Sequence, residues 1–134
     1  MGPRGSAVVC AAIAITCVIV LLEEPPPPTA TELAVRRGDE VFRNKAMCLT
    51  CHSLDGRGGQ NGPPLDHVAA MVIRMKGSRD QARQFFLDHL VDPANHPGAR
   101  HRAGPPPFTS CPSYRGALEE RELQDIAEYL LTLE

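Results

Sequence analysis

Apolar residues recur at helical spacing in four segments of the chain, and no segment reads convincingly as a strand. The first segment begins at Thr31, which the pattern favours as the N-cap, and it continues toward residue 48. The other three predicted helices span residues 66–76, 79–91 and 119–133. Pro and Gly are concentrated between them, at residues 55–64 and 93–116. The pattern therefore predicts an all-α domain over residues 31–134.

The first 24 residues differ from this domain in composition. Residues 5–22 carry no charge and are dense in Ala, Val, Ile and Leu, and their length is near the lower limit for a membrane-spanning helix. Arg4 precedes the run and Glu23-Glu24 follows it, which orients the N-terminus toward the cytoplasm. A cleaved signal peptide is the alternative, although no small-x-small site closes the apolar run. We expect residues 1–24 to be an uncleaved single-pass anchor in the inner membrane, with the domain on the periplasmic side.

A short proline run separates the anchor from the domain. Residues 25–30 contain Pro25 to Pro28, and consecutive prolines favour the extended polyproline II helix, which rises about 3.1 Å per residue. This stretch is therefore predicted to be a semi-rigid linker between membrane and domain.

The strongest chemical signal is Cys48-Leu49-Thr50-Cys51-His52, the C-x-x-C-H pattern of covalent haem attachment. Two thiols one helical turn apart can add to two vinyl groups of one porphyrin, and the histidine that follows can bind the iron. Three alternatives to haem stay open. A thioredoxin-like pair would need a βαβ context, which the pattern lacks. A structural zinc site would use Cys48, Cys51, His52 and Cys111. A chance occurrence would leave two ordinary buried thiols.

Composition and charge agree with a cofactor-containing domain. The chain of 134 residues has no Trp and only 4% aromatic residues, so a protein core built from its side chains alone would be small. A buried porphyrin would supply the missing apolar volume. The formal net charge is −2, and the only basic run is Arg100-His101-Arg102, so no nucleic-acid interface is predicted.

Residues 33–134 resemble a monohaem class I c-type cytochrome. Besides the C-x-x-C-H motif, Gly38 and Phe42 stand where that family has its first helix, and Gly62-Pro63-Pro64-Leu65 resembles its G-P-x-L segment. The resemblance implies a fold of about four to five helices around one haem c. It implies that Tyr129 packs on Gly38 where the first and last helices cross.

The resemblance also implies the ligand set on one side of the haem. Haem c would be bonded covalently to Cys48 and Cys51, and His52 would be the proximal iron ligand. The carbonyl oxygen of Pro63 would accept a hydrogen bond from Nδ1–H of His52 and so fix the orientation of the ring.

On the distal side the chain departs from the family pattern. Where the family has its ligating Met followed by Pro, this chain has Cys111-Pro112, with an aromatic residue two positions further on. A Cys111 thiolate would give His/Cys ligation, favour Fe(III) and lower the reduction potential. The alternatives are an open site or ligation by Met71, Met75, His89, His96 or His101.

The function implied is single-electron transfer at a membrane surface, by a carrier that is not an enzyme. Its partners would be a membrane redox complex or other electron-transfer proteins. One alternative is a haem-based sensor that binds small ligands at an exchangeable distal site, and another is a zinc-stabilised interaction module. Five basic residues are candidates for balancing the haem propionates or steering a partner, although ordinary solvated charge accounts for each of them as well: Arg57, Arg74, Lys76, Arg100 and Arg102.

Overall fold

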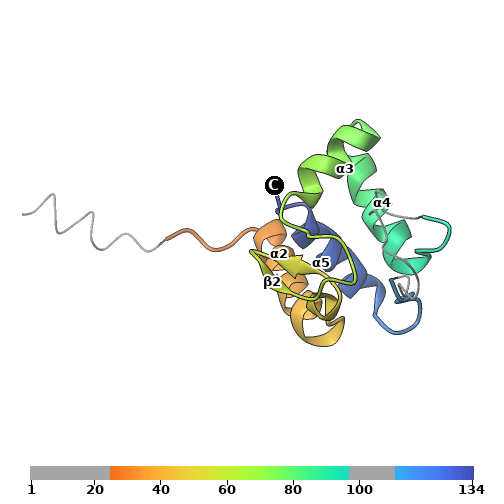
Figure 1. Cartoon of the computed structure of the whole chain (residues 1–134). Helices are drawn as coiled ribbons and strands as arrows, with labels where there is room; N and C mark the ends of the chain where they lie inside the picture. The colour runs from red at the N-terminus through yellow and green to blue at the C-terminus, as the bar shows by residue number, and fades with distance from the viewer. Residues whose placement is uncertain (1–24, 97–110) are drawn as a thin grey trace, which may run out of the picture.

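The computed structural model describes residues 25–96 and 111–134, so the predicted anchor at residues 5–22 lies outside the described residues. Within the described ranges, no helix combines the length and the apolar character needed to cross a bilayer. The elements follow in chain order (Figure 1): α2 (Ala30–Glu40), the π-helical turn η1 (Val41–Lys45), the 3₁₀ turn η2 (Cys48–Thr50), β1 (Ser53–Leu54), β2 (Arg57–Gly58), α3 (Val68–Lys76), α4 (Arg79–Val91) and α5 (Glu120–Leu130). The mostly helical fold is confirmed.

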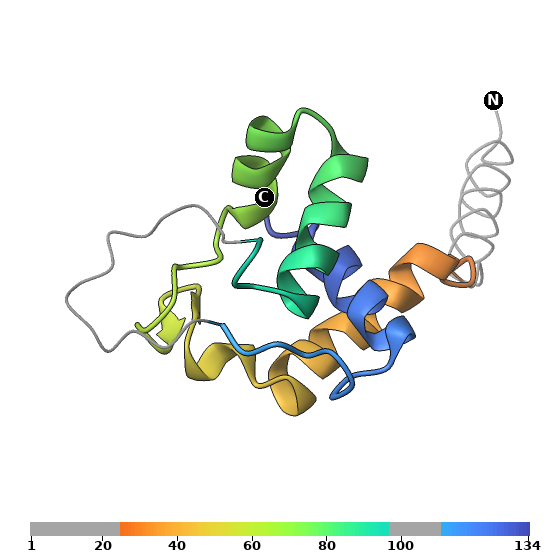
Figure 2. The same cartoon turned by 90° about the vertical axis from the view of Figure 1, so that its right-hand side faces the viewer.

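Helices α2 and α5 cross closely, and Gly38 lies at the crossing (Figure 2). A Cβ atom at Gly38 would overlap the backbone carbonyl of Asp125 and lie 2.9 Å from Cβ of Tyr129. One turn further along the chain, the rings of Phe42 and Tyr129 pack with their centroids 5.2 Å apart. The expected packing of Tyr129 on Gly38 is therefore confirmed, and glycine is required here because two backbones meet.

The predicted N-cap of the first helix is wrong by two residues. The cap is Thr29, whose hydroxyl accepts from the N–H of Glu32 at 3.2 Å, while the Glu32 carboxylate accepts from the N–H of Thr29 at 2.7 Å. This reciprocal pair is a capping box, and its S/T-x-x-E spacing is met by Thr29 and not by Thr31. The helix consequently begins at Ala30, the last residue of the predicted linker.

The expectation that the chain contains no strand is also wrong. Ser53–Leu54 pairs antiparallel with Arg57–Gly58, in a hairpin of two residues per strand. The two connecting residues, Asp55 and Gly56, both have positive φ, at 51° and 70°. A two-residue Asp-Gly turn with positive φ at both positions is the type I′ connection that suits hairpin twist. The loop predicted at residues 55–64 therefore begins inside a small hairpin.

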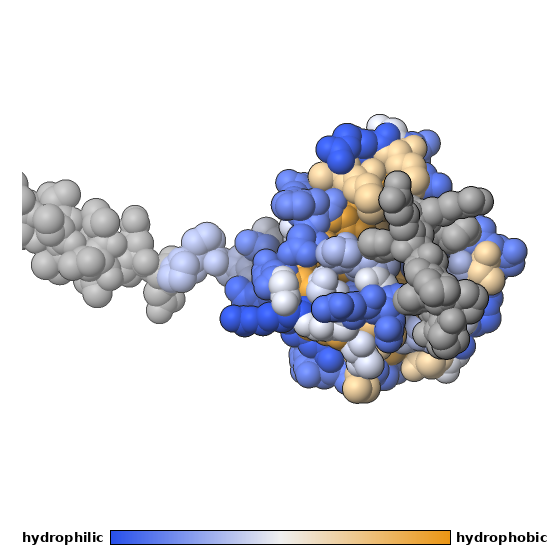
Figure 3. Space-filling view, viewed as in Figure 1, coloured by the Kyte–Doolittle hydropathy of each residue, from blue (hydrophilic) through white to orange (hydrophobic). Residues whose placement is uncertain are grey.

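Helices α3 and α4 lie side by side, and α4 packs against α5 (Figures 1 and 2). Gly77, with φ of 97°, ends α3, and Ser78 caps α4 by accepting from the N–H of Gln81 at 3.2 Å. The apolar faces of these helices meet in one core, whose largest members with almost no exposure are Phe42, Val72, Ile126 and Leu131. Figure 3 shows a mainly hydrophilic surface, with hydrophobic atoms exposed over α3.

Candidate haem attachment site

The C-x-x-C-H motif forms a single tight turn at the end of the first helical segment. Met47 has left-handed backbone angles (φ 52°, ψ 38°), which end the helix and start the 3₁₀ turn that follows. The N–H groups of Cys51 and His52 both donate to the carbonyl of Cys48, at 3.1 and 2.9 Å. The two thiols thus lie one turn apart, both half-buried and neither in a disulfide bond.

The imidazole of His52 is oriented by a backbone carbonyl. Its Nδ1 lies 2.8 Å from the carbonyl oxygen of Pro63, which is the hydrogen bond implied by the family resemblance. Because a carbonyl can only accept, the proton must sit on Nδ1, and Nε2 then carries a lone pair that is available to bind a metal. A Cβ atom at Gly62 would lie only 2.6 Å from Nδ1, so the chain passes directly against the ring.

A glycine-rich loop covers the motif, although sequence reasoning identified it only as a loop. The N–H of Gly59 donates to the carbonyl of Leu49 at 2.8 Å, and the N–H of Gly62 donates to that of Cys51 at 2.7 Å. A side chain at Gly59 would collide with the carbonyl of Thr50. The run of glycines was the available signal, since backbone can approach backbone this closely only where no Cβ intervenes.

Cys111 is brought close to the attachment cysteines. Its thiol is half-buried and lies near enough to Cys51 for a charge on one sulfur to disfavour a charge on the other. Burial raises the pKa of the Cys111 thiol and raises that of Cys48 to about 12. Both groups are therefore neutral thiols in the haem-free chain at neutral pH. The structure places Cys111, 60 positions further along the chain, on the same part of the molecule as Cys51.

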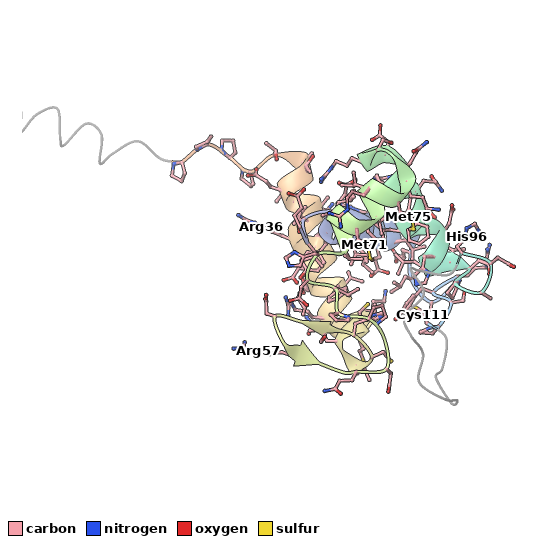
Figure 4. All side chains as sticks on the ribbon, turned by 45° about the horizontal axis from the view of Figure 1, so that its top comes forward. Arg36, Arg57, Met71, Met75, His96 and Cys111 are labelled. Atoms are coloured by element: carbon pink, nitrogen blue, oxygen red, sulfur yellow. The ribbon has the colours of Figure 1, made fainter. Side chains whose placement is uncertain are left out.

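The other predicted distal ligands lie in different surroundings. Met71 and Met75 lie on α3, and Figure 4 shows them apart from Cys111. Met71 packs against the core and Met75 is 49% exposed. Nδ1 of His89 lies 2.6 Å from the carbonyl oxygen of His96, and the His89 ring stacks on Phe85. His101 is outside the described residues.

The basic residues predicted to balance the cofactor or steer a partner have mixed placements. Nζ of Lys76 lies 4.6 Å from the centre of the Phe85 ring, a cation–π contact that accounts for its position. Arg57 is exposed on the hairpin (Figure 4), and Arg74 is exposed on α3. Arg100 and Arg102 lie outside the described residues.

The alternatives to haem receive no support from the geometry. Residues 25–96 and 111–134 contain no group of three or more His, Cys, Asp or Glu side chains placed to hold a metal ion, and Cys48, Cys51, His52 and Cys111 are accordingly not arranged as a zinc site there. The same ranges contain no βαβ unit of the kind a thioredoxin-like pair needs. The adjacent thiols and the oriented imidazole do fit haem c, since they supply two attachment points and one nitrogen ligand.

Comparison with known proteins agrees with this fit. A model of the family described as cytochrome c matches residues 35–134. No curated protein and no solved structure matches the chain significantly. The match covers well over half of the chain, including the motif, the glycine-rich loop and the residues at which α2 and α5 cross. The chain therefore belongs to the cytochrome c family, in which haem c is attached covalently through two cysteines and serves electron transfer.

Proposed function

We propose that this protein is a membrane-tethered carrier of single electrons, not an enzyme, and that His52 and Cys111 are the axial ligands of its haem. The haem, when bound, supplies one iron that alternates between Fe(III) and Fe(II). The protein's own contribution is to hold the ligands and to set how strongly each oxidation state is favoured.

The protein alone orients the proximal side of the site. The Pro63 carbonyl holds the proton of His52 on Nδ1 and increases the basicity of Nε2. The loop that supplies this carbonyl is itself tied to the motif by the hydrogen bonds from Gly59 and Gly62. The imidazole is therefore oriented without any rearrangement of the backbone.

The proposed ligation is supported by the half-buried Cys111 thiol, which lies within electrostatic range of both attachment cysteines, Cys48 and Cys51. A cysteine bound as thiolate places a negative charge on the iron, which stabilises Fe(III) and lowers the reduction potential. Met71 and Met75, which would raise the potential, lie on another element. The arrangement therefore favours a carrier of low potential.

The test is the electron paramagnetic resonance spectrum of the oxidised protein, compared between the wild type and Cys111→Ala. We expect the low-spin signal of a thiolate-ligated haem in the wild type and its loss in Cys111→Ala. Met71→Leu is the matched control, since it alters a rival ligand and should leave the signal in place. An unchanged signal in Cys111→Ala would exclude Cys111 as the ligand.

Addition of carbon monoxide to the reduced protein separates the carrier from a ligand-binding sensor. A firmly held sixth ligand slows the addition, whereas an exchangeable distal site reacts at once. Rapid and complete binding in the wild type would favour the sensor.

The proposed tether consists of residues 5–22 and the prolines at 25–28. Confinement to a membrane raises the effective concentration of a carrier toward a neighbouring redox complex, which is the partner we propose together with other electron-transfer proteins. The site of action would be the periplasmic face of the inner membrane. The full chain should sediment with membranes and resist extraction by salt, and a variant lacking residues 5–22 should not.

A further inference from the structure

We infer that Tyr114, assisted by Ser113, is a positioning residue that holds Cys111 at the distal side of the site. The inference rests on the proposed ligation by Cys111. Tyr114 lies three positions after Cys111, and its side chain reaches back to the segment that carries the attachment motif.

The first tie joins the Tyr114 side chain to the start of the motif. The Tyr114 hydroxyl donates to the carbonyl oxygen of Ala46 at 2.8 Å. Ala46 is buried and follows the last residue of η1, where the left-handed Met47 interrupts the helix. Carbonyls at a helix end lack partners within the helix, so Tyr114 satisfies a group that would otherwise be unpaired.

The second tie joins the backbone beside Cys111 to the end of α4. The N–H of Tyr114 donates to the carbonyl of Leu90 at 2.9 Å, and the hydroxyl of Ser113 donates to that of Val91 at 2.6 Å. These are again carbonyls of a last helical turn. The Cys111 segment therefore bridges the ends of two helical segments, and Tyr114 takes part in both connections.

The Tyr114 side chain lies near the cysteine thiols, so the hydrogen bonds described above bear on the position of Cys111. Tyr114 is half-buried, packs on the core, and interacts with the thiols of Cys48, Cys51 and Cys111. Tyr114 belongs to the segment of Cys111 and is tied to the carbonyl of Ala46, two positions before Cys48, so it limits the separation between the two segments. Loss of its hydroxyl should therefore loosen Cys111 without unfolding the domain.

The experiment uses the holoprotein and measures how fast imidazole displaces the distal ligand of the oxidised haem. In Tyr114→Phe we expect displacement roughly five- to tenfold faster, the change that corresponds to one lost hydrogen bond. The low-spin resonance signal should also broaden or split, because Cys111 then adopts more than one geometry.

The matched control is Tyr129→Phe, which removes the only other tyrosine hydroxyl of the chain. That hydroxyl accepts from Nη2 of Arg43, in η1, at 3.2 Å, and Tyr129 lies where α2 and α5 cross. We expect Tyr129→Phe to lower stability without changing the displacement rate or the spectrum. If Tyr114 positions Cys111, the two variants differ in displacement rate and in spectrum. If the role of Tyr114 is purely structural, the two variants behave alike in both measurements.

Equal displacement rates in Tyr114→Phe and Tyr129→Phe would overturn the inference. If Tyr114→Phe does not accumulate with haem, Ser113→Ala replaces it; this variant cuts the tie to Val91 and the weaker hydrogen bond that the Ser113 hydroxyl accepts from the N–H of Arg115. In Ser113→Ala, an imidazole displacement rate at least threefold above that of Tyr129→Phe supports the positioning role. A smaller difference between these two variants overturns it. Failure of the proposed ligation is recognised separately, because Cys111→Ala would then keep the wild-type spectrum.

Discussion

At the scale of single residues, the site depends on what stands next to His52. The Pro63 carbonyl decides which ring nitrogen carries the proton, and at Gly62 the chain passes so close that a Cβ would lie 2.6 Å from Nδ1. A ligand imidazole with such a partner is more basic than one exposed to water. One backbone carbonyl and one missing side chain thus set the electron donation from the proximal ligand.

Gly62→Ala should therefore raise the reduction potential. The added methyl group displaces the His52 ring and weakens its bond to Pro63, so the imidazole donates less electron density to Fe(III). Potentiometric titration of the holoprotein measures the change. Gly116→Ala is the control, because a Cβ there meets no neighbouring atom although the positive φ of 75° strains the backbone. A potential that falls in Gly62→Ala would contradict this account.

At the scale of elements, α2 and α5 begin in a similar way. The carboxylate of Glu32 accepts from the N–H of Thr29, and that of Glu122 accepts from the N–H of Glu119 at 2.8 Å. Glu122 also receives two hydrogen bonds from Nζ of Lys45, each at 2.7 Å. A negative charge in the first turn is favoured by the helix dipole as well as by these donors.

The two glutamates should make stability depend on pH in the acid range. The pKa of Glu32 is lowered mainly by the Thr29 N–H, and the pKa of Glu122 is lowered mainly by Lys45, both from a usual value of 4.5. Their contribution is therefore complete above pH 4.5 and is lost as the pH falls through the lower folded-state values. Urea unfolding of the wild type at several pH values should show this decline.

The double variant Glu32→Gln and Glu122→Gln tests the assignment. It should be less stable than the wild type at pH 7, and the difference should narrow as the pH falls below the usual value of 4.5. If the difference in free energy of unfolding between the wild type and the double variant stays constant with pH, other carboxylates cause the loss of stability in acid.

The crossing of α2 and α5 leaves no room for a side chain at Gly38. Gly38→Ala should lower the free energy of unfolding by about 3 kcal/mol, since a backbone carbonyl of Asp125 must move to admit one methyl group. Helix propensity alone would give the opposite sign, because alanine is favoured over glycine by about 1 kcal/mol. Urea unfolding measures the loss, with Arg36→Ala at an exposed position of the same helix as control. A stabilised Gly38→Ala would mean that the helices separate there at little cost.

At the scale of the whole molecule, two ion pairs join the first described helical segments, α2 and η1, to α5. Nε and Nη2 of Arg37 donate to both carboxylate oxygens of Asp125, 88 positions away, at 2.6 and 2.8 Å. Asp125 is buried, and its planar pairing with a guanidinium is the strong form of this interaction. The Lys45–Glu122 pair joins η1 to α5 near the same crossing.

Asp125→Asn should lower the midpoint of urea unfolding markedly, because it leaves Arg37 without its charged partner at a partly buried position. The spectrum of the bound haem should not change, since the carboxylate of Asp125 pairs with arginines of the crossing and not with the attachment residues. Glu120→Gln is the control at an exposed position in the same helix. A shift of the haem spectrum in Asp125→Asn would link the crossing to the iron.

The sequence predicted the helices and the proximal side well because both depend on local patterns. Apolar spacing located α3, α4 and α5 to within three residues at each end. The family motif predicted the hydrogen bond between Nδ1 of His52 and the carbonyl oxygen of Pro63. The hairpin was missed because its strands are too short to show alternation, although Asp55-Gly56 was a turn signal. The bridge through Tyr114 was out of reach, since it joins backbone carbonyls that no side-chain pattern records.

The meeting of α2 with α5 has a consequence for the order of events during biosynthesis. The first described helix finds its main partner only in the last one, so the domain cannot close until nearly all of the described chain has been made. Until then the turn at residues 48–52 stays exposed, because the domain around it has not yet folded. The thiols would thus be accessible to haem attachment during that interval, before the last helix closes the domain.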